Sequence, residues 1–152
     1  MQIDEADRRL LRQLQAEPDI ANADLAERAG LTPATCWRRL QKLRQAGILQ
    51  GFRAVINWSA LGFEVSVSLR ITLDKTNPRA FDEFMAAART VPEVCEIQTF
   101  LGRVDVRLHV LARDMAHYQE IYRERILTLP HISDIEALMH VAEIKRNKAL
   151  PI

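Results

Sequence analysis

A run of basic side chains with no acidic residue among them is the feature of this sequence best suited to binding a polyanion. Residues 32–53 contain no Asp or Glu, which gives this segment a charge of +5 in a chain whose formal net charge is +1. Lys and Arg neutralise phosphates, and Arg also forms paired hydrogen bonds with guanine edges. We therefore predict a local surface for double-stranded DNA, against the alternative of a solvated basic helix face. The cations are Arg38, Arg39, Lys42, Arg44 and Arg53.

Two expected helices and the turn between them would position these cations. Residues 22–30 (NADLAERAG) have the pattern of a short amphipathic helix ending at Gly30, where a glycine cap is favoured. Thr32 and Pro33 then supply the N-cap and the first helical position of a second helix. Two helices joined by a short turn that contains glycine are typical of the helix-turn-helix motif. We expect the second helix to be the one that reads DNA.

A helical wheel separates the two faces of this second helix. Cys36, Leu40 and Leu43 fall on one stripe, which we expect to be buried. The other side carries small, polar and basic residues, which suits entry into the major groove. Trp37 can contact DNA or prop the helix on its flank, and Asn22 can contact phosphate or serve only as a helix cap. The expected DNA-binding residues are Asn22, Thr32, Ala34, Thr35, Trp37, Arg38, Arg39, Gln41, Lys42, Arg44 and Arg53.

The composition is that of a globular protein. The 152 residues are 48% hydrophobic and 27% charged, and the near-neutral net charge argues against a general nucleic-acid coat. The acidic opening of residues 1–5, and the lack of an apolar run approaching about 18 residues, predict no leader peptide, no membrane contact and a cytoplasmic location. We expect Cys36 and Cys95 to be reduced packing residues rather than a disulfide.

The first half is expected to form a winged helix-turn-helix domain over residues 1–56. An additional helix begins near Ile3, with acidic residues in its first turn, and ends at Pro18. A strand over residues 48–56 follows the second helix of the motif as the wing. Residues 57–62 then have the composition of a linker.

Beyond this linker the periodicity changes. Apolar residues alternate with polar ones along residues 63–73, which predicts a strand with one buried face. The elements expected after it are a helix over 78–89, strands over 94–101 and 105–111, a helix over 115–127 and a last strand over 132–141. The order is β-α-β-β-α-β.

An internal repeat supports this order. Residues 90–97 (TVPEVCEI) match residues 128–135 (TLPHISDI) at an offset of 38, since 128 minus 90 is 38. Two interleaved β-α-β units predict a ferredoxin-like fold over residues 63–152, which makes the whole chain α+β. The last strand is apolar in both registers, so we expect the open face of the sheet to be apolar and to pair with a second copy.

Short motifs run through both halves. The first half contains Asp4-x-x-Asp7-x-x-x-Leu11, Leu25-Ala26, Gly30-Leu31-Thr32, Arg38-Arg39-Leu40-x-x-Leu43, Gly47-Ile48 and Leu61-Gly62. The second half contains Gly102-x-x-Asp105, Leu129-Pro130 and Glu143-x-Lys145. Together they resemble the Lrp/AsnC (leucine-responsive, feast/famine) transcription regulators over essentially the whole chain. The resemblance implies homodimers made through both halves, usually assembled further into octamers that wrap DNA.

The resemblance also implies a small effector, typically an amino acid, bound at subunit interfaces beside the loop at residues 102–105. The amides of this turn and Arg103 can meet a carboxylate, while Asp105 can meet an ammonium group; Asp105 can instead cap an ordinary hairpin. Family members often carry Thr where this chain has Ile135 and Ala137, so the identity of the effector stays open. The expected effector-binding residues are Thr99, Phe100, Leu101, Gly102, Arg103, Asp105, Asp134, Ile135, Glu136 and Ala137.

We expect no catalytic residues, no metal site and no cofactor. The histidines lack the spacing of metal ligands, and the sequence shows neither a Ser/His/Asp constellation nor a phosphate-binding glycine loop. The expected function is a DNA-binding transcription regulator that responds to a small effector. Two alternatives stay open: an architectural protein that wraps DNA with little effector control, and a ferredoxin-like enzyme or regulatory subunit. The run of cations without an acidic residue in the second helix and the wing disfavours the enzyme.

Overall fold

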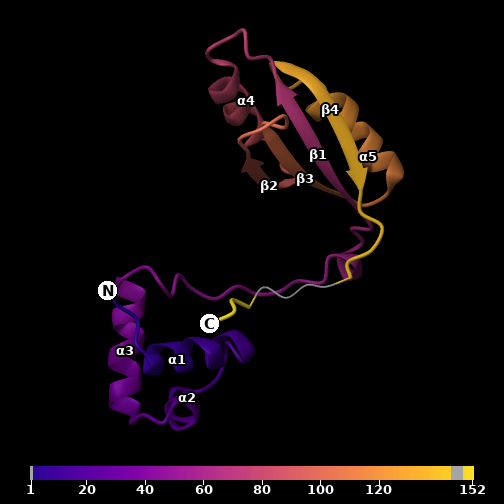
Figure 1. Cartoon of the computed structure of the whole chain (residues 1–152). Coiled ribbons are helices and arrows are strands. Elements are labelled where there is room, and N and C mark those ends of the chain that lie inside the picture. The colour runs from indigo at the N-terminus through magenta and orange to yellow at the C-terminus, as the bar shows by residue number, and fades with distance from the viewer. Residues whose placement is uncertain (1, 145–148) are drawn as a thin grey trace. The chain divides into compact units, whose positions relative to one another are not determined.

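The computed structural model describes residues 2–144 and 149–152, and the chain divides into two compact units (Figure 1). The first contains residues 2–55 together with the C-terminal residues 149–152, and the second contains residues 56–144. These bounds differ from the expected 1–56 and 63–152. Leu150 exchanges hydrogen bonds with Gln15, and Arg12 donates to the Ile152 carbonyl at 2.5 Å, so the last residues pack with the first unit.

The first unit is a three-helix domain built from α1 (Glu5–Ala16), α2 (Asn22–Ala29) and α3 (Pro33–Gln45). Gly30 ends α2 in the left-handed conformation with φ 68°, and Thr32 caps α3 by accepting a hydrogen bond from the Thr35 amide. Both features confirm the expected turn chemistry. The buried apolar side chains of this unit are Leu10, Leu14, Leu25, Ala26, Ala29, Cys36, Leu40 and Leu43. Burial also raises the pKa of the Cys36 thiol.

The prediction of a wing strand over residues 48–56 is wrong for the single chain. Residues 50–57 form no strand, and the side chains of Phe52, Val55 and Ile56 are about half exposed or more. A strand is stabilised by hydrogen bonds to a neighbouring strand, and no segment in the described part of the chain pairs with residues 50–57.

The second unit confirms the ferredoxin-like prediction. Its order is β1 (Val65–Leu73), α4 (Ala80–Ala88), β2 (Val94–Thr99), β3 (Val106–Ala112), α5 (Met115–Ile121) and β4 (Ile132–Met139), with a 3₁₀ turn η1 (Ser59–Leu61) before β1. The antiparallel sheet has the order β2-β3-β1-β4. The helix expected over 115–127 continues beyond α5 as a π-helical segment, η2 (Tyr122–Ile126). The predicted linker at 57–62 belongs to this unit, because the Trp58 ring packs 5.9 Å from the ring of His109 on β3.

The core of the second unit lies between one face of the sheet and its two helices (Figure 1). Alternate residues of β1 and β3 point into it, as the strand pattern predicts. Phe84 from α4 and Ile121 from α5 pack against them and are fully buried. The buried strand residues are Val67, Leu69, Ile71, Leu73, Val106, Leu108, Val110 and Ala112.

The open face of the sheet is mainly polar, which corrects the expectation of an apolar face. The register explains the difference. Ile135 and Ala137 lie opposite Ile71 and Leu69, so they share the helix-covered face. The open face carries Ser66, Ser68, Arg70, Thr72, Glu96, Gln98, Arg107, His109, Asp134 and Glu136, with Leu111 and Leu138 as apolar exceptions. Cys95, expected as a packing residue, is exposed on β2. None of the helices in residues 2–144 and 149–152 could span a membrane.

Candidate DNA-binding and effector sites

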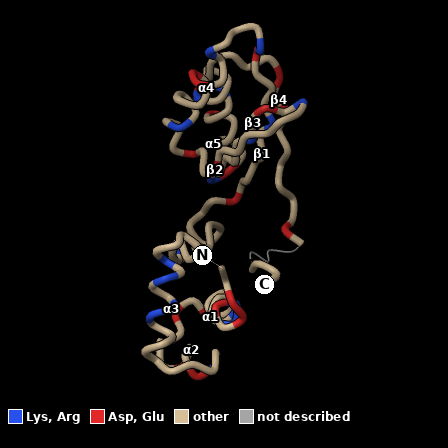
Figure 2. Tube along the Cα trace, turned by 60° about the vertical axis from the view of Figure 1, so that its left-hand side comes forward, with Lys and Arg blue, Asp and Glu red and all other residues tan. Residues whose placement is uncertain are grey.

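The exposed side of α3 carries the residues expected to meet DNA. Thr32, Ala34, Arg38, Lys42 and Arg44 are exposed, while Thr35 and Gln41 are partly exposed. Figure 2 shows the basic residues along α3 and the acidic residues on α1. Among the described residues, no carboxylate lies within ion-pair distance of Arg38, Lys42 or Arg44, so these cations are available to phosphates and base edges.

Trp37 leaves 59% of its surface exposed, which disfavours the interpretation that it props α3 by packing. Arg53, in the extended segment that follows the helices, is also exposed. Asn22 does not cap α2, because the N-cap is Ala21. Its side-chain amide instead donates to the Pro33 carbonyl at 3.3 Å and joins the start of α2 to the start of α3.

Arg39 differs from its neighbours on α3. Its Nη1 atom donates to Asp4 Oδ2 at 2.7 Å and to Asp7 Oδ1 at 2.8 Å. These bonds raise the pKa of Arg39, with the bond to Asp7 as the largest cause. The side chain is only 28% exposed. The sequence-based expectation that Arg39 contacts DNA is therefore not supported by its geometry, because its charge is already paired within the first unit.

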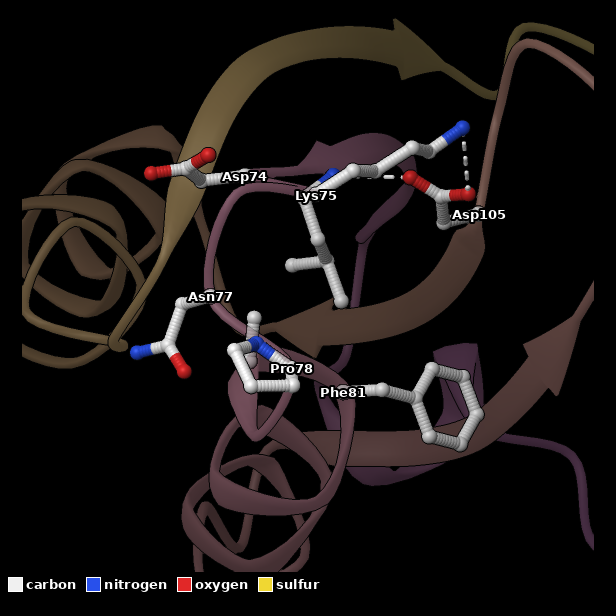
Figure 3. Close-up of a pocket in the computed structure, with 8 residues that line it drawn as sticks. Asp74, Lys75, Asn77, Pro78, Phe81 and Asp105 are labelled. Carbon is white, nitrogen blue, oxygen red and sulfur yellow. Dashed lines mark hydrogen bonds and ion pairs between the residues drawn. The ribbon is translucent and has the colours of Figure 1, made fainter.

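A pocket of about 250 Å³ lies in the second unit, where β1 ends and α4 begins (Figure 3). Its walls come from the end of β1, from the β1–α4 loop, from the first turns of α4 and from the residue before β3. The volume is below the range of about 300–1,000 Å³ typical for drug-sized ligands, so the pocket suits a smaller molecule. The lining residues are Leu73, Asp74, Lys75, Asn77, Pro78, Ala80, Phe81 and Asp105.

The carboxylate of Asp105 is held by a hydrogen bond and an ion pair. Its Oδ2 atom accepts a hydrogen bond from the Leu73 amide at 2.9 Å, and its Oδ1 atom lies 3.3 Å from Lys75 Nζ. The side chain is 17% exposed. Figure 3 shows Lys75 reaching across to this carboxylate, whereas the Asp74 carboxylate points away from it. Asp105 thus fastens the end of β1 and also presents a negative charge to the pocket.

The Asp74 carboxylate, in contrast, forms hydrogen bonds within its own loop. Its Oδ1 atom accepts from the amide and the hydroxyl of Thr76 at 2.9 and 2.7 Å, and the amide bond is the largest cause of its lowered pKa. The Asp74 amide donates to the carbonyl of His131, a residue held at φ 64°. The His131 ring lies 2.5 Å from Glu83 Oε2, and this contact is the largest cause of the lowered pKa of Glu83.

Of the effector-binding residues expected from the sequence, only Asp105 lines this pocket. Thr99 lies at the end of β2, and the hairpin after it places Leu101 fully in solvent. Gly102 adopts φ 156° in the same hairpin, and the Arg103 carbonyl accepts from the Thr72 hydroxyl. The β4 residues 134–137 pair with β1 residues 72–69 and do not reach the pocket. The hairpin residue Phe100 is 46% exposed.

The opposite wall of the pocket was not predicted from the sequence and is formed by Lys75, Asn77, Pro78 and Phe81. A signal was available. Antiparallel neighbours place the end of one strand beside the start of the other, and here Ile71 on β1 pairs with Val106 on β3. The polar turn after β1 was therefore bound to lie beside Asp105. The family motif residue Lys145 lies outside the described residues.

Comparisons with known proteins agree with this arrangement. A family model described as the Lrp/AsnC ligand binding domain matches residues 66–150, and one described as winged helix-turn-helix DNA-binding matches residues 3–50. The leucine-responsive regulatory protein of Salmonella typhimurium is 32% identical over 150 residues, covering 99% of this chain and 92% of that protein.

Two solved structures are also similar. A transcriptional regulator from Neisseria meningitidis in complex with L-Met has 27% identity and a TM-score of 0.91, covering 99% of this chain and 97% of that one. An AsnC family transcriptional regulator from Agrobacterium tumefaciens has 31% identity and a TM-score of 0.87, covering 98% and 97%.

A helix-turn-helix unit joined to a ferredoxin-like ligand-binding unit defines a class of DNA-binding transcription regulators. The chain belongs to the Lrp/AsnC family within that class. Its relatives are regulators and not enzymes, so the enzyme alternative is set aside.

Proposed function

We propose that the effector of this regulator is an amino acid and that it binds in the pocket between Lys75 and Asp105. The observation that carries the proposal is the opposite charge of these two side chains within one small cavity. A zwitterion entering the pocket separates the pair, with its ammonium group at Asp105 Oδ1 and its carboxylate at Lys75 Nζ. The L-Met complex of the Neisseria relative supports an amino acid as the ligand class.

The rest of the pocket favours an apolar amino-acid side chain. Leu73, Pro78, Ala80 and Phe81 form an apolar wall beside the charged pair, and Phe81 is 46% exposed. Burying such surface against an aliphatic or thioether side chain contributes roughly 25 cal/mol per Å². Asp74 and Asn77 are the other polar residues of the lining.

We further propose that α3 enters the major groove and contacts DNA through Thr32, Ala34, Thr35, Trp37, Arg38, Gln41, Lys42 and Arg44. Arg53 and Asn22 would contact flanking phosphates. In this proposal Arg38 reads base edges, because it lies on the exposed face close to the N-terminal half of α3. Lys42 and Arg44 neutralise phosphates, since they lie in the last turn.

We also propose a cytoplasmic homodimer that assembles to an octamer. The exposed and unpaired segment around Phe52, Val55 and Ile56 supports a partner chain, because free backbone groups beside apolar side chains are a template for pairing. The family resemblance supports the higher assembly. Light scattering coupled to size-exclusion chromatography tests both steps.

A thermal-shift screen of the twenty amino acids tests the proposed effector. A ligand that binds only the folded state raises the apparent stability by about 2.7 kcal/mol at a concentration one hundred times its dissociation constant. We expect an apolar amino acid to raise the melting temperature and to change the gel shift of a duplex taken from upstream of the protein's own gene. DNA binding that no amino acid alters would instead favour an architectural protein with little effector control.

A further inference from the structure

Arg39 joins the recognition helix α3 to the N-terminus of α1 through a closed set of hydrogen bonds. Arg39 Nη1 donates to one oxygen each of Asp4 and Asp7. The other oxygens of these carboxylates cap α1: the Asp7 amide donates to Asp4 Oδ1 at 2.9 Å, and the Asp4 amide donates to Asp7 Oδ2 at 3.2 Å. All four carboxylate oxygens therefore have a partner, and one guanidinium supplies two of the four bonds.

Burial shows that this contact is not an ordinary surface ion pair. Asp7 is 2% exposed and is the one charged residue that is buried in the described part of the chain. A buried carboxylate is costly unless it is paired, and removing its partner is more costly than never having the pair. Arg39 Nε is also buried, and it has no hydrogen-bond partner among the described residues. The guanidinium thus lies against the protein rather than extending toward a phosphate.

This anchor adds a polar constraint to the orientation of α3, whose buried side is formed by Cys36, Leu40 and Leu43. Arg39 lies between the buried residue Leu40 and the exposed residue Arg38, at the boundary of the two faces. Side-chain atoms lie about 5–6 Å from a helix axis, so a 20° rotation of α3 would move them by about 2 Å. A displacement of that size breaks a hydrogen bond to a base edge, which requires donor and acceptor within about 3 Å.

A second polar contact from α1 supports the same role. Arg9 Nε donates to the Ala29 carbonyl at 3.0 Å, which fastens the end of α2 to α1. The helix α1 therefore holds α2 through Arg9 and α3 through Asp4 and Asp7. Hydrophobic contacts are not directional, whereas these hydrogen bonds require a defined geometry and so add to what apolar packing provides.

We propose that Asp7, together with Asp4, is a positioning residue for DNA reading, and that Arg39 acts through this contact rather than by binding phosphate. The inference rests on the proposed contact residues of α3. In this proposal, two acidic residues increase the affinity for DNA.

The substitution Asp7→Asn tests this role, because simple electrostatics and positioning predict opposite results. Removing a negative charge from a DNA-binding unit should strengthen binding if charge alone matters. If Asp7 positions α3, the variant should bind its preferred duplex at least tenfold more weakly, with unchanged or slightly stronger binding to a scrambled duplex. The probes are a duplex selected by the parent protein from a random pool and a scrambled duplex of equal length.

Glu17→Gln is the matched control. Glu17 pairs with Arg28 at 2.6 Å in the same unit, so this variant loses the same charge and also an arginine pair, but one in which neither partner lies on α3. We expect it to bind both duplexes as well as the parent or better. Circular dichroism and melting curves establish that binding is measured on folded protein. Asp4→Asn, at an exposed position, serves if Asp7→Asn does not fold.

The variant Arg39→Gln separates positioning from phosphate contact. A lost phosphate contact would lower the slope of log affinity against log salt by roughly 0.9 on both duplexes. We expect an unchanged slope on the scrambled duplex, a loss on the selected duplex equal to that of Asp7→Asn, and no further loss in the double variant.

Parent-like binding of the selected duplex by Asp7→Asn, or an equal fall in slope on both duplexes for Arg39→Gln, would overturn the inference. If Arg38→Ala also binds the selected duplex like the parent, the failure lies in the proposed contact residues of α3 themselves.

Discussion

Lys75 Nζ lies 3.3 Å from Asp105 Oδ1, while the second oxygen of the same carboxylate accepts a hydrogen bond from the Leu73 amide. The carboxylate therefore has one oxygen that serves the fold and one that faces the pocket. Lys75 is 66% exposed and Asp105 is 17% exposed, so the lysine is the partner able to move away. Such a pair contributes little to stability and is readily exchanged for a ligand that carries both charges.

Asp105→Asn should weaken effector binding while leaving the fold intact. The amide oxygen of Asn can still accept from the Leu73 amide, but the charge that meets an ammonium group is lost. We expect the affinity for the amino acid identified in the screen to fall by about 1.5–3 kcal/mol, the usual contribution of a hydrogen bond to a charged group. Calorimetric titration of parent and variant measures this change.

Asp74→Asn is the control for that experiment, because Asp74 lines the same pocket but bonds to Thr76. The Asp74→Asn variant should bind the amino acid with the same affinity as the parent. An unchanged affinity in Asp105→Asn would leave Asp105 with a purely structural function at the end of β1.

Arg38→Ala should weaken binding to specific DNA by roughly 1–3 kcal/mol, the usual contribution of a bidentate guanine contact. Arg38 is exposed on α3, and no carboxylate in the described residues is paired with it. Competition gel shifts against duplexes altered one base pair at a time would locate the base that it reads. Equal affinity of variant and parent for the preferred duplex would exclude Arg38 from base reading.

Lys42→Ala should act differently, because a phosphate contact carries no sequence information. We expect weaker binding to all duplexes and a salt slope smaller by roughly 0.9. The measurement is a fluorescence-anisotropy titration at several salt concentrations. A loss confined to one preferred sequence would assign Lys42 to base reading instead.

Local patterns in the sequence were sufficient to predict most of the fold. Gly30, Thr32 and Pro33 marked the helix-turn-helix turn because caps depend on residues adjacent in the chain. Alternation around Val67 and Leu69 located β1, and the repeat located the two β-α-β units. The prediction of a wing strand at residues 48–56 was wrong because this strand does not depend on local sequence alone. A strand is stabilised by a partner, and the sequence of a segment does not show whether a partner is present.

The same difference between local and long-range features explains which site residues were predicted from the sequence. Asp105 was predicted because its turn is a local motif, but its partner Lys75 lies 30 residues earlier and reaches it only through the β1–β3 pairing (105 minus 75 is 30). The basic character of Arg39 is visible locally, whereas its bonds to Asp4 and Asp7 join residues more than 30 positions apart and were not predicted. The polar open face was missed because the register of β4 depends on its pairing with β1.

The second unit should fold without the first. Residues 56–144 contain the larger core, including Phe84, Ile121 and Ile126, all of which are fully buried within that range. We expect this fragment to melt cooperatively in circular dichroism. Residues 1–55 alone should be marginally stable, because so small a unit buries little surface and has also lost the contacts of Leu150 and Ile152 with α1. A fragment 56–144 that lacks a cooperative transition would show that its fold depends on the rest of the chain.

The stability of the second unit should decrease in acid partly through Glu83. The contact with His131 is the largest cause that holds the pKa of Glu83 below its ordinary value of 4.5. A carboxyl whose pKa is lower in the folded state stabilises the fold at pH values above the ordinary pKa, and this contribution is lost as the pH falls through the lowered value. Melting temperatures of the 56–144 fragment should therefore decrease as the pH falls below about 5, and less steeply in Glu83→Gln. Glu120→Gln, which changes an exposed carboxylate on α5, should show the full decrease of the parent. If Glu83→Gln and Glu120→Gln follow the parent curve equally, the Glu83–His131 contact does not contribute to the stability of the β1–α4 region.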